Sequence, residues 1–214
     1  ISDTHWGCRG DSTLFLDNQK KFYDEIFFPY LEKNSIKTVI IAGDLVDRRK
    51  YININTLSRM RRDFLDKMKE MNVYCIPGNH DVYFKNTNDL NALNELLGEY
   101  DNIQVFNRPI EKPMDCETNI LFLPWICQDN YEESMGAIEK TRAQICVGHL
   151  EIEGFEMFYG ITCEEGMKFD VFTKFDVVMT GHFHHKSSQG NIHYLGAPYQ
   201  MTWHDYDDPK GFHI

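Results

Sequence analysis

The chain has 214 residues, of which 42% are apolar and 26% are charged, values that are ordinary for a globular protein. This apolar content argues against disorder, and no apolar run approaches the about eighteen residues of a membrane span, so we expect a soluble protein. The length suits one domain over residues 1–214. The 22 Lys and Arg against 33 Asp and Glu give a net charge of −11. Such a surface is not built mainly to bind phosphate backbones, so any contact with nucleic acid is expected to be local.

The cysteines and the chain ends indicate the setting of the protein. No cysteines are spaced C-x-x-C, and several lie in apolar runs, so they are expected to be reduced core thiols of a cytoplasmic, non-secreted protein. They are Cys8, Cys75, Cys116, Cys127, Cys146 and Cys163. The chain opens at Ile1-Ser2 without a methionine or a signal peptide, and residues 211–214 resemble a strand cut short. We therefore expect a few residues before the chain and a further region after it.

Helices alternate with strands early in the chain, and strands pair as hairpins late. Residues 14–31 carry apolar side chains at helical spacing, residues 38–42 read as a buried strand, and residues 55–71 form a second amphipathic helix capped by Asn55. Further helices are predicted at residues 89–97 and 131–140, and further strands at 73–76, 103–106, 120–123, 144–147, 175–179, 192–195 and 211–214. The order predicts an α/β fold whose sheet is mixed or split into two layers.

Five apolar strands each end in a small polar cluster. In chain order the clusters are Asp3-Thr4-His5, Gly43-Asp44-Leu45-Val46-Asp47, Gly78-Asn79-His80-Asp81, Gly148-His149 and Gly181-His182-Phe183-His184. Sites in α/β folds are built where strands end, so we expect these clusters to converge. Residues two apart on an extended segment point to the same side. Asp3 should therefore reach the same pocket as His5, and His182 the same pocket as His184.

The side chains in these clusters are typical metal ligands. Carboxylate, amide oxygen and imidazole without thiolate suit Mn²⁺, Fe²⁺ or Zn²⁺ in a catalytic role. The seven candidates are Asp3, His5, Asp44, Asn79, His149, His182 and His184. Because seven exceed what one ion needs, we predict two ions sharing a bridging carboxylate, an arrangement that can clamp a phosphoryl group for in-line attack.

In order and from end to end, the five clusters resemble the signature of calcineurin-like metallophosphoesterases. The resemblance implies a two-layer β-sandwich flanked by helices. It also implies one metal among Asp3, His5, Asp44 and His184, and another among Asp44, Asn79, His149 and His182. His80 matches the family's catalytic histidine, and Asp81 matches an aspartate that orients its ring.

Other segments resemble the SbcD-type DNA repair nucleases, the family of the meiotic-recombination-eleven nuclease. They are His5-Trp6-Gly7, residues 175–184, Gly196-Ala197-Pro198-Tyr199 and Pro209-Lys210-Gly211-Phe212. This resemblance implies a dimeric exonuclease or endonuclease that uses two divalent ions, Mn²⁺ by expectation, and acts on DNA in repair or recombination. It also implies an SMC-like (SbcC-type) ATPase subunit as partner.

Three functions remain open on the sequence. A DNA phosphodiesterase is the first, and a phosphomonoesterase is favoured by the acidic charge and by Asp47, where many SbcD-type nucleases have histidine. A metal-free interaction module has no need of the full ligand set. Asp47 is expected to orient a ligand. The run Arg48-Arg49-Lys50 offers either contacts to a DNA backbone or a solvated loop, and Trp6 and Trp125 either line the cleft or pack in the core.

Overall fold

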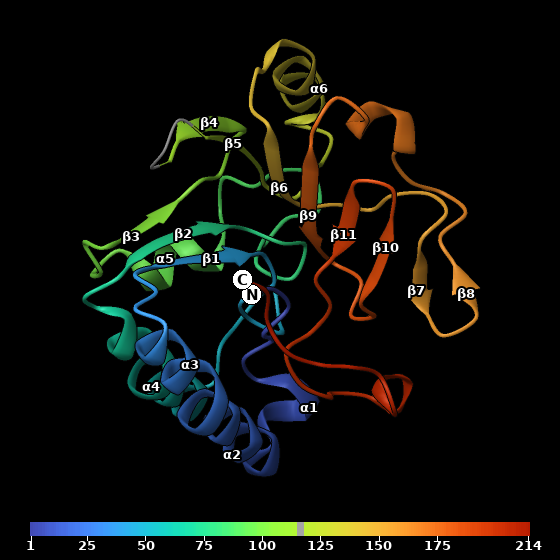
Figure 1. Cartoon of the computed structure of the whole chain (residues 1–214). Helices are drawn as coiled ribbons and strands as arrows, with labels where there is room; N and C mark the ends of the chain where they lie inside the picture. The colour runs from blue at the N-terminus through green and yellow to red at the C-terminus, as the bar shows by residue number, and fades with distance from the viewer. Residues whose placement is uncertain (115–117) are drawn as a thin grey trace.

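The computed structural model describes residues 1–114 and 118–214. Two β-sheets pack against each other, and helices cover the outer side of each sheet (Figure 1). The predicted α/β fold with two flanked sheet layers is therefore confirmed. Among the described residues, five cysteines are buried and free of disulfides, as expected. The sixth predicted core thiol, Cys116, lies outside the described residues.

The first sheet carries the N-terminal half of the site. Its three described strands are parallel and lie in the order β1 (Thr38–Ala42), β2 (Asn72–Ile76) and β3 (Ile103–Val105). The chain start runs along β1, because Ala42 N–H donates to the Ile1 carbonyl at 2.9 Å and Asp3 N–H donates to the Gly43 carbonyl at 3.1 Å. This pairing brings the first polar cluster beside the second.

The second sheet carries the rest of the site. Its described strands lie in the order β10 (Ser187–Gln189), β11 (Ile192–Tyr194), β9 (Val177–Gly181), β6 (Ile145–His149), β5 (Asn119–Leu123) and β4 (Ile110–Pro113). The inner strands are parallel, and the edge strands β10 and β4 are antiparallel to their neighbours. The predicted antiparallel strand near residues 192–195 is thus antiparallel to β10 but parallel to β9.

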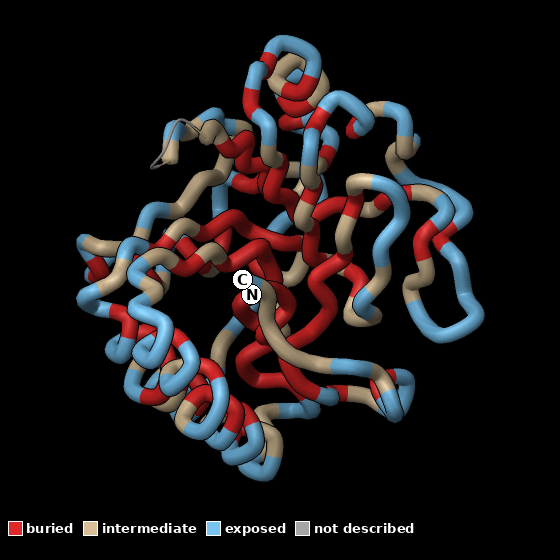
Figure 2. Tube along the Cα trace, in the orientation of Figure 1, coloured by how far each residue is buried: buried red, intermediate tan, exposed pale blue. Residues whose placement is uncertain are grey.

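Buried side chains form the layer between the two sheets. On β5, Phe122 packs with Ala42 and Ile76 of the first sheet, whereas its neighbours Leu121 and Leu123 belong to the core on the opposite face. This alternation is what a sheet buried on both faces requires. Buried positions accordingly follow the strands of both sheets (Figure 2).

The predicted helix over residues 14–31 is one helical segment with a change of winding. It comprises α2 (Thr13–Phe22), the π-helical turn η1 (Tyr23–Phe27) and α3 (Phe28–Lys33). Pro29 lies in the first turn of α3 and has no N–H to donate, so regular i→i+4 bonding cannot run through this point. The apolar periodicity continues across the turn and hides the change from the sequence pattern.

Asparagine side chains cap the start of α4 (Ile54–Met60) and of α5 (Ala92–Leu97). The predicted helix 55–71 is α4 (Ile54–Met60), η2 (Arg61–Leu65) and η3 (Asp66–Met68). Its cap is Asn53, whose side chain accepts from Asn55 N–H at 2.8 Å, so the predicted cap Asn55 is wrong. Asn91 caps the next helix. The other described elements are α1 (Cys8–Asp11), α5 (Ala92–Leu97), α6 (Tyr131–Lys140), the hairpin β7 (Glu156–Phe158) and β8 (Ile161–Thr162), and the short helices η5 (Phe169–Phe172) and η6 (Trp203–Asp205).

Residues 211–214 do not form the predicted strand. Phe212 instead packs its ring on Phe27, with centroids 5.0 Å apart, and His213 places Nε2 3.0 Å from the Leu195 carbonyl. Aromatic packing therefore fixes this segment without a ladder of backbone hydrogen bonds. In the two described stretches, no helix combines the length and the apolar character needed to cross a membrane.

Candidate metal centre

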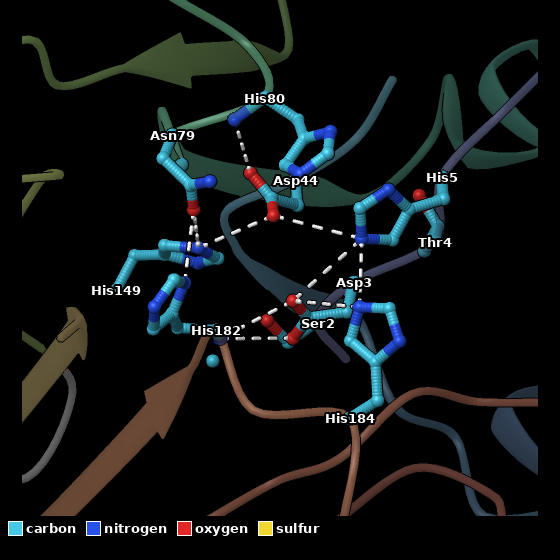
Figure 3. A network of polar contacts seen from close by, with 12 residues as sticks. Ser2, Asp3, Thr4, His5, Asp44, Asn79, His80, His149, His182 and His184 are labelled. Atoms are coloured by element: carbon cyan, nitrogen blue, oxygen red, sulfur yellow. Dashed lines mark hydrogen bonds and ion pairs between the residues drawn. The ribbon is translucent and has the colours of Figure 1, made fainter. Parts of the chain in front are cut away.

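The polar clusters that follow β1, β2, β6 and β9 meet at one place between the two sheets (Figure 3). All seven side chains predicted to bind metal lie in this cluster, and they form two groups joined by Asp44. The structure thus brings together residues as far apart in the chain as Asp3 and His184.

The first group contains Asp3, His5 and His184, whose donor atoms all lie within 4.8 Å of one another. The Nε2 atoms of His5 and His184 are 3.0 Å apart, and Asp3 Oδ1 lies 3.9 Å from the first and 4.0 Å from the second. Two ring nitrogens and a buried carboxylate aimed at one point form a donor set that fits a divalent cation.

The second group contains Asp44, His149 and His182, which meet the same distance limit. Asn79 completes it, since its Oδ1 lies 2.9 Å from His182 Nδ1 and 3.1 Å from His149 Nε2. His149 Nδ1 donates to the Ala42 carbonyl at 2.9 Å, which fixes the ring and directs Nε2 to the group. These oxygen and nitrogen donors also fit a divalent cation.

Asp44 stands between the two groups. Its Oδ2 lies 3.5 Å from His5 Nε2 and 3.4 Å from His149 Nε2, while Oδ1 accepts the His80 N–H at 2.8 Å. Although burial opposes ionisation, the surrounding imidazoles, His149 foremost, lower the pKa of Asp44 below its usual value. A charged carboxylate is therefore held where it can serve both groups.

The histidines of the centre differ in how readily they lose a proton. Burial, followed by the charge of neighbouring histidines, lowers the pKa of His182 and of His184 to about 3, so both rings are neutral at neutral pH. For His149, burial is outweighed by Asp44, which raises its pKa to about 9. A cation bound at the second group would thus displace a proton from His149.

The two-residue spacing predicts extended backbone in the centre, but the structure has left-handed turns there. Asp3, His5, Asp44 and His182 have φ values of 53°, 42°, 52° and 94°. Such left-handed conformations cost on the order of 1–3 kcal/mol each and persist where surrounding contacts over-determine them. Here the contacts include the His182 N–H, which lies 3.2 Å from each carboxylate oxygen of Asp3. Asp3 and His5 share a pocket because of these turns, which the two-residue spacing alone does not explain.

Glycines allow the ligand segments to approach closely. A Cβ added to Gly43, whose φ is 90°, would overlap the His149 ring, and a Cβ added to Gly78 would overlap the Asp44 carboxylate. Any larger residue at these two positions would clash with a ligand side chain, so both positions require glycine.

Asp81 is oriented differently from what the resemblance implied, because a backbone carbonyl holds the His80 ring. The His80 ring places Nδ1 2.7 Å from the Asp47 carbonyl oxygen, which can only accept, so Nδ1 is the donor. The Asp81 carboxylate instead accepts the N–H groups of Gly78 at 2.8 Å and Val46 at 3.1 Å. In the structure Asp81 ties the loop after β2 to the loop after β1, and it does not orient His80. Burial, followed by the charge of Asp44, raises the pKa of Asp81 to about 7.

The side chains that follow Asp44 lie at the edge of the centre. Asp47 Oδ1 is 3.4 Å from His5 Nδ1, a position from which it can orient the ring. Arg48 forms an ion pair with Asp11 at 2.6 Å, so its charge is already engaged. Arg49 is half-buried and Lys50 is exposed.

The two tryptophans have different places. Trp6 is buried and stacks on Tyr23, so it belongs to the core. Trp125 lies 5.1 Å from the His182 ring and, with His149, lines a pocket of about 270 Å³. Trp125 thus borders the centre, which was one of its two predicted placements.

Two residues that support the centre lie outside the five polar clusters. Buried Gln19 on α2 donates from Nε2 to the carbonyls of Thr4 at 3.2 Å and His5 at 3.4 Å. The Tyr199 hydroxyl donates to the same Thr4 carbonyl. Both stabilise the left-handed turn at His5 from elements distant in the chain, and neither stands in a polar cluster.

Comparison with known proteins decides the family. The model of the family described as Calcineurin-like phosphoesterase matches residues 1–186. The chain belongs to this family. Exonuclease subunit 1 of enterobacteria phage T4 is 32% identical over 219 residues, covering 99% of this chain and 62% of the relative. The SbcD component of the nuclease SbcCD of Staphylococcus epidermidis is 25% identical over 241 residues, covering 100% of this chain and 64% of the relative.

The chain thus spans less than two thirds of the length of these curated relatives. Among solved structures, it resembles the crystal structure of Pseudomonas putida nuclease MPE with a TM-score of 0.43 and 18% sequence identity, over 90% of this chain and 64% of that chain.

Proposed function

We propose that this chain is a phosphodiesterase that uses two divalent ions to cleave DNA. The observation that carries the proposal is the pair of donor groups that share Asp44, because two cations held side by side can neutralise charge on one phosphoryl group. The arrangement that supports it has Asp3, His5 and His184 on one side of Asp44, and Asn79, His149 and His182 on the other.

The similarity to a phage exonuclease and to an SbcCD nuclease supports a nucleic-acid substrate over a small phosphate ester. By the same similarity we propose an SMC-like ATPase of the SbcC type as partner, a homodimer, manganese as the ion and a cytoplasmic role in DNA repair or recombination. We also propose that residues 1–214 form a single catalytic domain.

The reaction that the centre supports is in-line hydrolysis of a phosphodiester. When bound, the divalent ions would lower the pKa of a coordinated water and offset negative charge on the phosphoryl oxygens. His80 is the side chain suited to the leaving group. Its Nδ1–H is held by the Asp47 carbonyl, so Nε2 is the nitrogen that can carry a proton toward the departing oxygen. The backbone N–H of His80 also donates to Asp44, and this bond fixes the loop that carries the His80 ring.

The net charge of −11 favours the alternative, a phosphomonoesterase. Asp47 no longer favours it. The Asp47 carboxylate lies 3.4 Å from His5 and 3.9 Å from Arg48, and these contacts offset part of the negative charge that would repel a phosphate. For the nuclease, we propose that the partner subunit, a second copy and sequence beyond this domain share in holding the DNA. Arg49 and Lys50 are the candidate local contacts to the backbone.

The two functions are separated by substrate and by salt. With Mn²⁺ and the partner ATPase, the full-length protein should cleave labelled single- or double-stranded DNA, and the rate should fall steeply as salt rises, because phosphate contacts release counterions. A phosphomonoesterase needs only a dianionic end group and should respond weakly to salt. Strong hydrolysis of a small phosphomonoester with no cleavage of any DNA would overturn the nuclease proposal.

Asp47 is proposed to act by orienting His5. Asp47→Ala removes the carboxylate that lies 3.4 Å from His5 Nδ1 and should weaken Mn²⁺ binding by about 10–100-fold, as loss of an outer contact to a ligand does. Asp47→His can still accept from His5 Nδ1 and should preserve DNA cleavage. Titration with Mn²⁺ and a cleavage assay on both variants check this. Unchanged Mn²⁺ affinity in Asp47→Ala would show that Asp47 does not work through His5.

A further inference from the structure

The segment that follows β11 passes beside the first donor group. It lies beyond residues 1–186, which the family model matches, and it turns through η6 before returning toward the centre of the molecule (Figure 1). Lys210 is nearly buried on this segment, with 9% of its side chain exposed. Its Nζ donates to the carbonyl oxygen of His184 at 2.8 Å. A charged donor thus bonds to the backbone of a residue in the first group.

Two carboxylates hold the Lys210 ammonium in place. Asp205 Oδ1 accepts from it at 2.8 Å and Asp208 Oδ2 at 2.6 Å. Asp205 also accepts through Oδ2 from the N–H groups of Met201 at 3.0 Å and Thr202 at 2.7 Å, which closes the turn around η6. Because both carboxylates are themselves nearly buried, the position of Nζ is fixed by its surroundings.

The same segment makes further hydrogen bonds and an ion pair beside the first group. Ala197 N–H donates to the His184 carbonyl at 3.1 Å, so that oxygen accepts twice. The hydroxyl of Tyr199 donates to the Thr4 carbonyl, next to His5. Asp208 Oδ1 lies 2.8 Å from Nδ1 of His185, the residue after His184. Within the described residues, the segment makes no hydrogen bond to Asn79, His149 or His182.

We propose that Lys210 is a positioning residue for the first metal site, acting through the backbone of His184. With the ammonium in place, the His184 ring points at His5 Nε2, 3.0 Å away, and the first group is assembled before an ion arrives. Without it, the His184 carbonyl keeps only the Ala197 N–H, so the His184 ring is held less firmly toward the first site. The second site keeps Asp44, Asn79, His149 and His182. This inference rests on the proposed two-ion centre.

Mn²⁺ titration of the purified full-length protein tests the proposal without using activity. In Lys210→Met the dissociation constant of one ion should rise by about 10–100-fold, the range for losing a contact that orients a ligand, and that of the other should not change. Lys210→Arg keeps the charge and should recover part of the loss. Two ions bound with unchanged affinity in Lys210→Met would overturn the proposal.

Lys174 provides a matched control. Its Nζ also donates to carbonyl oxygens, those of Ile138, Glu139 and Thr141 at the end of α6. These contacts precede β6 and β9, whereas the donor groups lie at the ends of those strands. Lys174→Met should lower the melting temperature and leave both dissociation constants unchanged. If Lys210→Met does not fold, Asp208→Asn, which removes one of the two carboxylates on the ammonium, should weaken the same ion to a smaller extent.

Combination with ligand variants identifies which ion responds. If Lys210 acts through His184, Lys210→Met should add no further loss to His184→Ala, whereas it should add its full loss to His149→Ala. Additive losses with both ligand variants would overturn action through His184. If His184→Ala leaves both Mn²⁺ dissociation constants unchanged, the two-ion centre is refuted. If only Lys210→Met leaves them unchanged, the role of Lys210 is refuted and the two-ion centre stands.

Discussion

Replacing Asp44 by asparagine should abolish cleavage and remove tight binding of both ions. The carboxylate lies 3.5 Å from the His5 nitrogen of one group and 3.4 Å from the His149 nitrogen of the other, so its charge serves both. Asparagine retains an oxygen for the His80 N–H and nearly the same shape, so the fold should survive. Loss of a contact that only orients a ligand lowers metal affinity by about 10–100-fold. We expect the affinity for each ion to fall by more than this in Asp44→Asn.

Two measurements check the Asp44 prediction. A Mn²⁺ titration gives the number of ions and their affinities directly. Thermal unfolding gives a second reading, because an ion present at about 100 times its dissociation constant stabilises the folded state by about 2.7 kcal/mol, and Asp44→Asn should lose this gain. Asp63 is a matched control, since it is buried in η2 and pairs with Arg62. Asp63→Asn should lower stability without changing Mn²⁺ binding, and two ions at full occupancy in Asp44→Asn would refute the shared-carboxylate arrangement.

Much of the fold was predictable because its strands are short apolar runs that end abruptly. The predicted strand 38–42 and helix 131–140 coincide with β1 and α6. The failures occurred where local pattern and tertiary context differ. Apolar spacing continues through the π-helical turn η1 before Pro29, and residues 211–214 alternate like a strand although Phe212 is fixed by aromatic packing. A pattern of burial does not distinguish sheet pairing from packing.

The members of the centre were predictable from strand ends, but their orientations were not. The backbone turns to positive φ at Asp3 and His5, a conformation set by contacts with the loop after β1 that no local spacing encodes. Asp81 follows His80 directly, yet its carboxylate faces Gly78 and Val46. Support from Gln19, Tyr199 and Lys210 arises between elements distant in the chain, so only the assembled fold reveals it.

His80→Ala should bind both ions as the unchanged protein does, yet cleave DNA about 10²–10⁴-fold more slowly, the range for loss of general acid–base assistance. The reason is the position of the ring, which is fixed by the Asp47 carbonyl through Nδ1 and leaves Nε2 to protonate the departing oxygen. Half-buried His193, whose ring contacts Ser188, offers a control, and His193→Ala should leave cleavage unchanged.

A change of leaving group distinguishes the roles open to His80. A p-nitrophenyl phosphodiester releases a phenolate far less basic than a sugar alkoxide, so it needs little protonation, and the loss in His80→Ala should shrink sharply on this substrate. An equal loss on both substrates would remove the general-acid role. His80 also lies within 4.8 Å of donor atoms of His5 and Asp44, so weaker Mn²⁺ binding in His80→Ala would instead make it a ligand. Metal affinity and leaving-group dependence together therefore assign this side chain, because a ligand changes the first and an acid changes only the second.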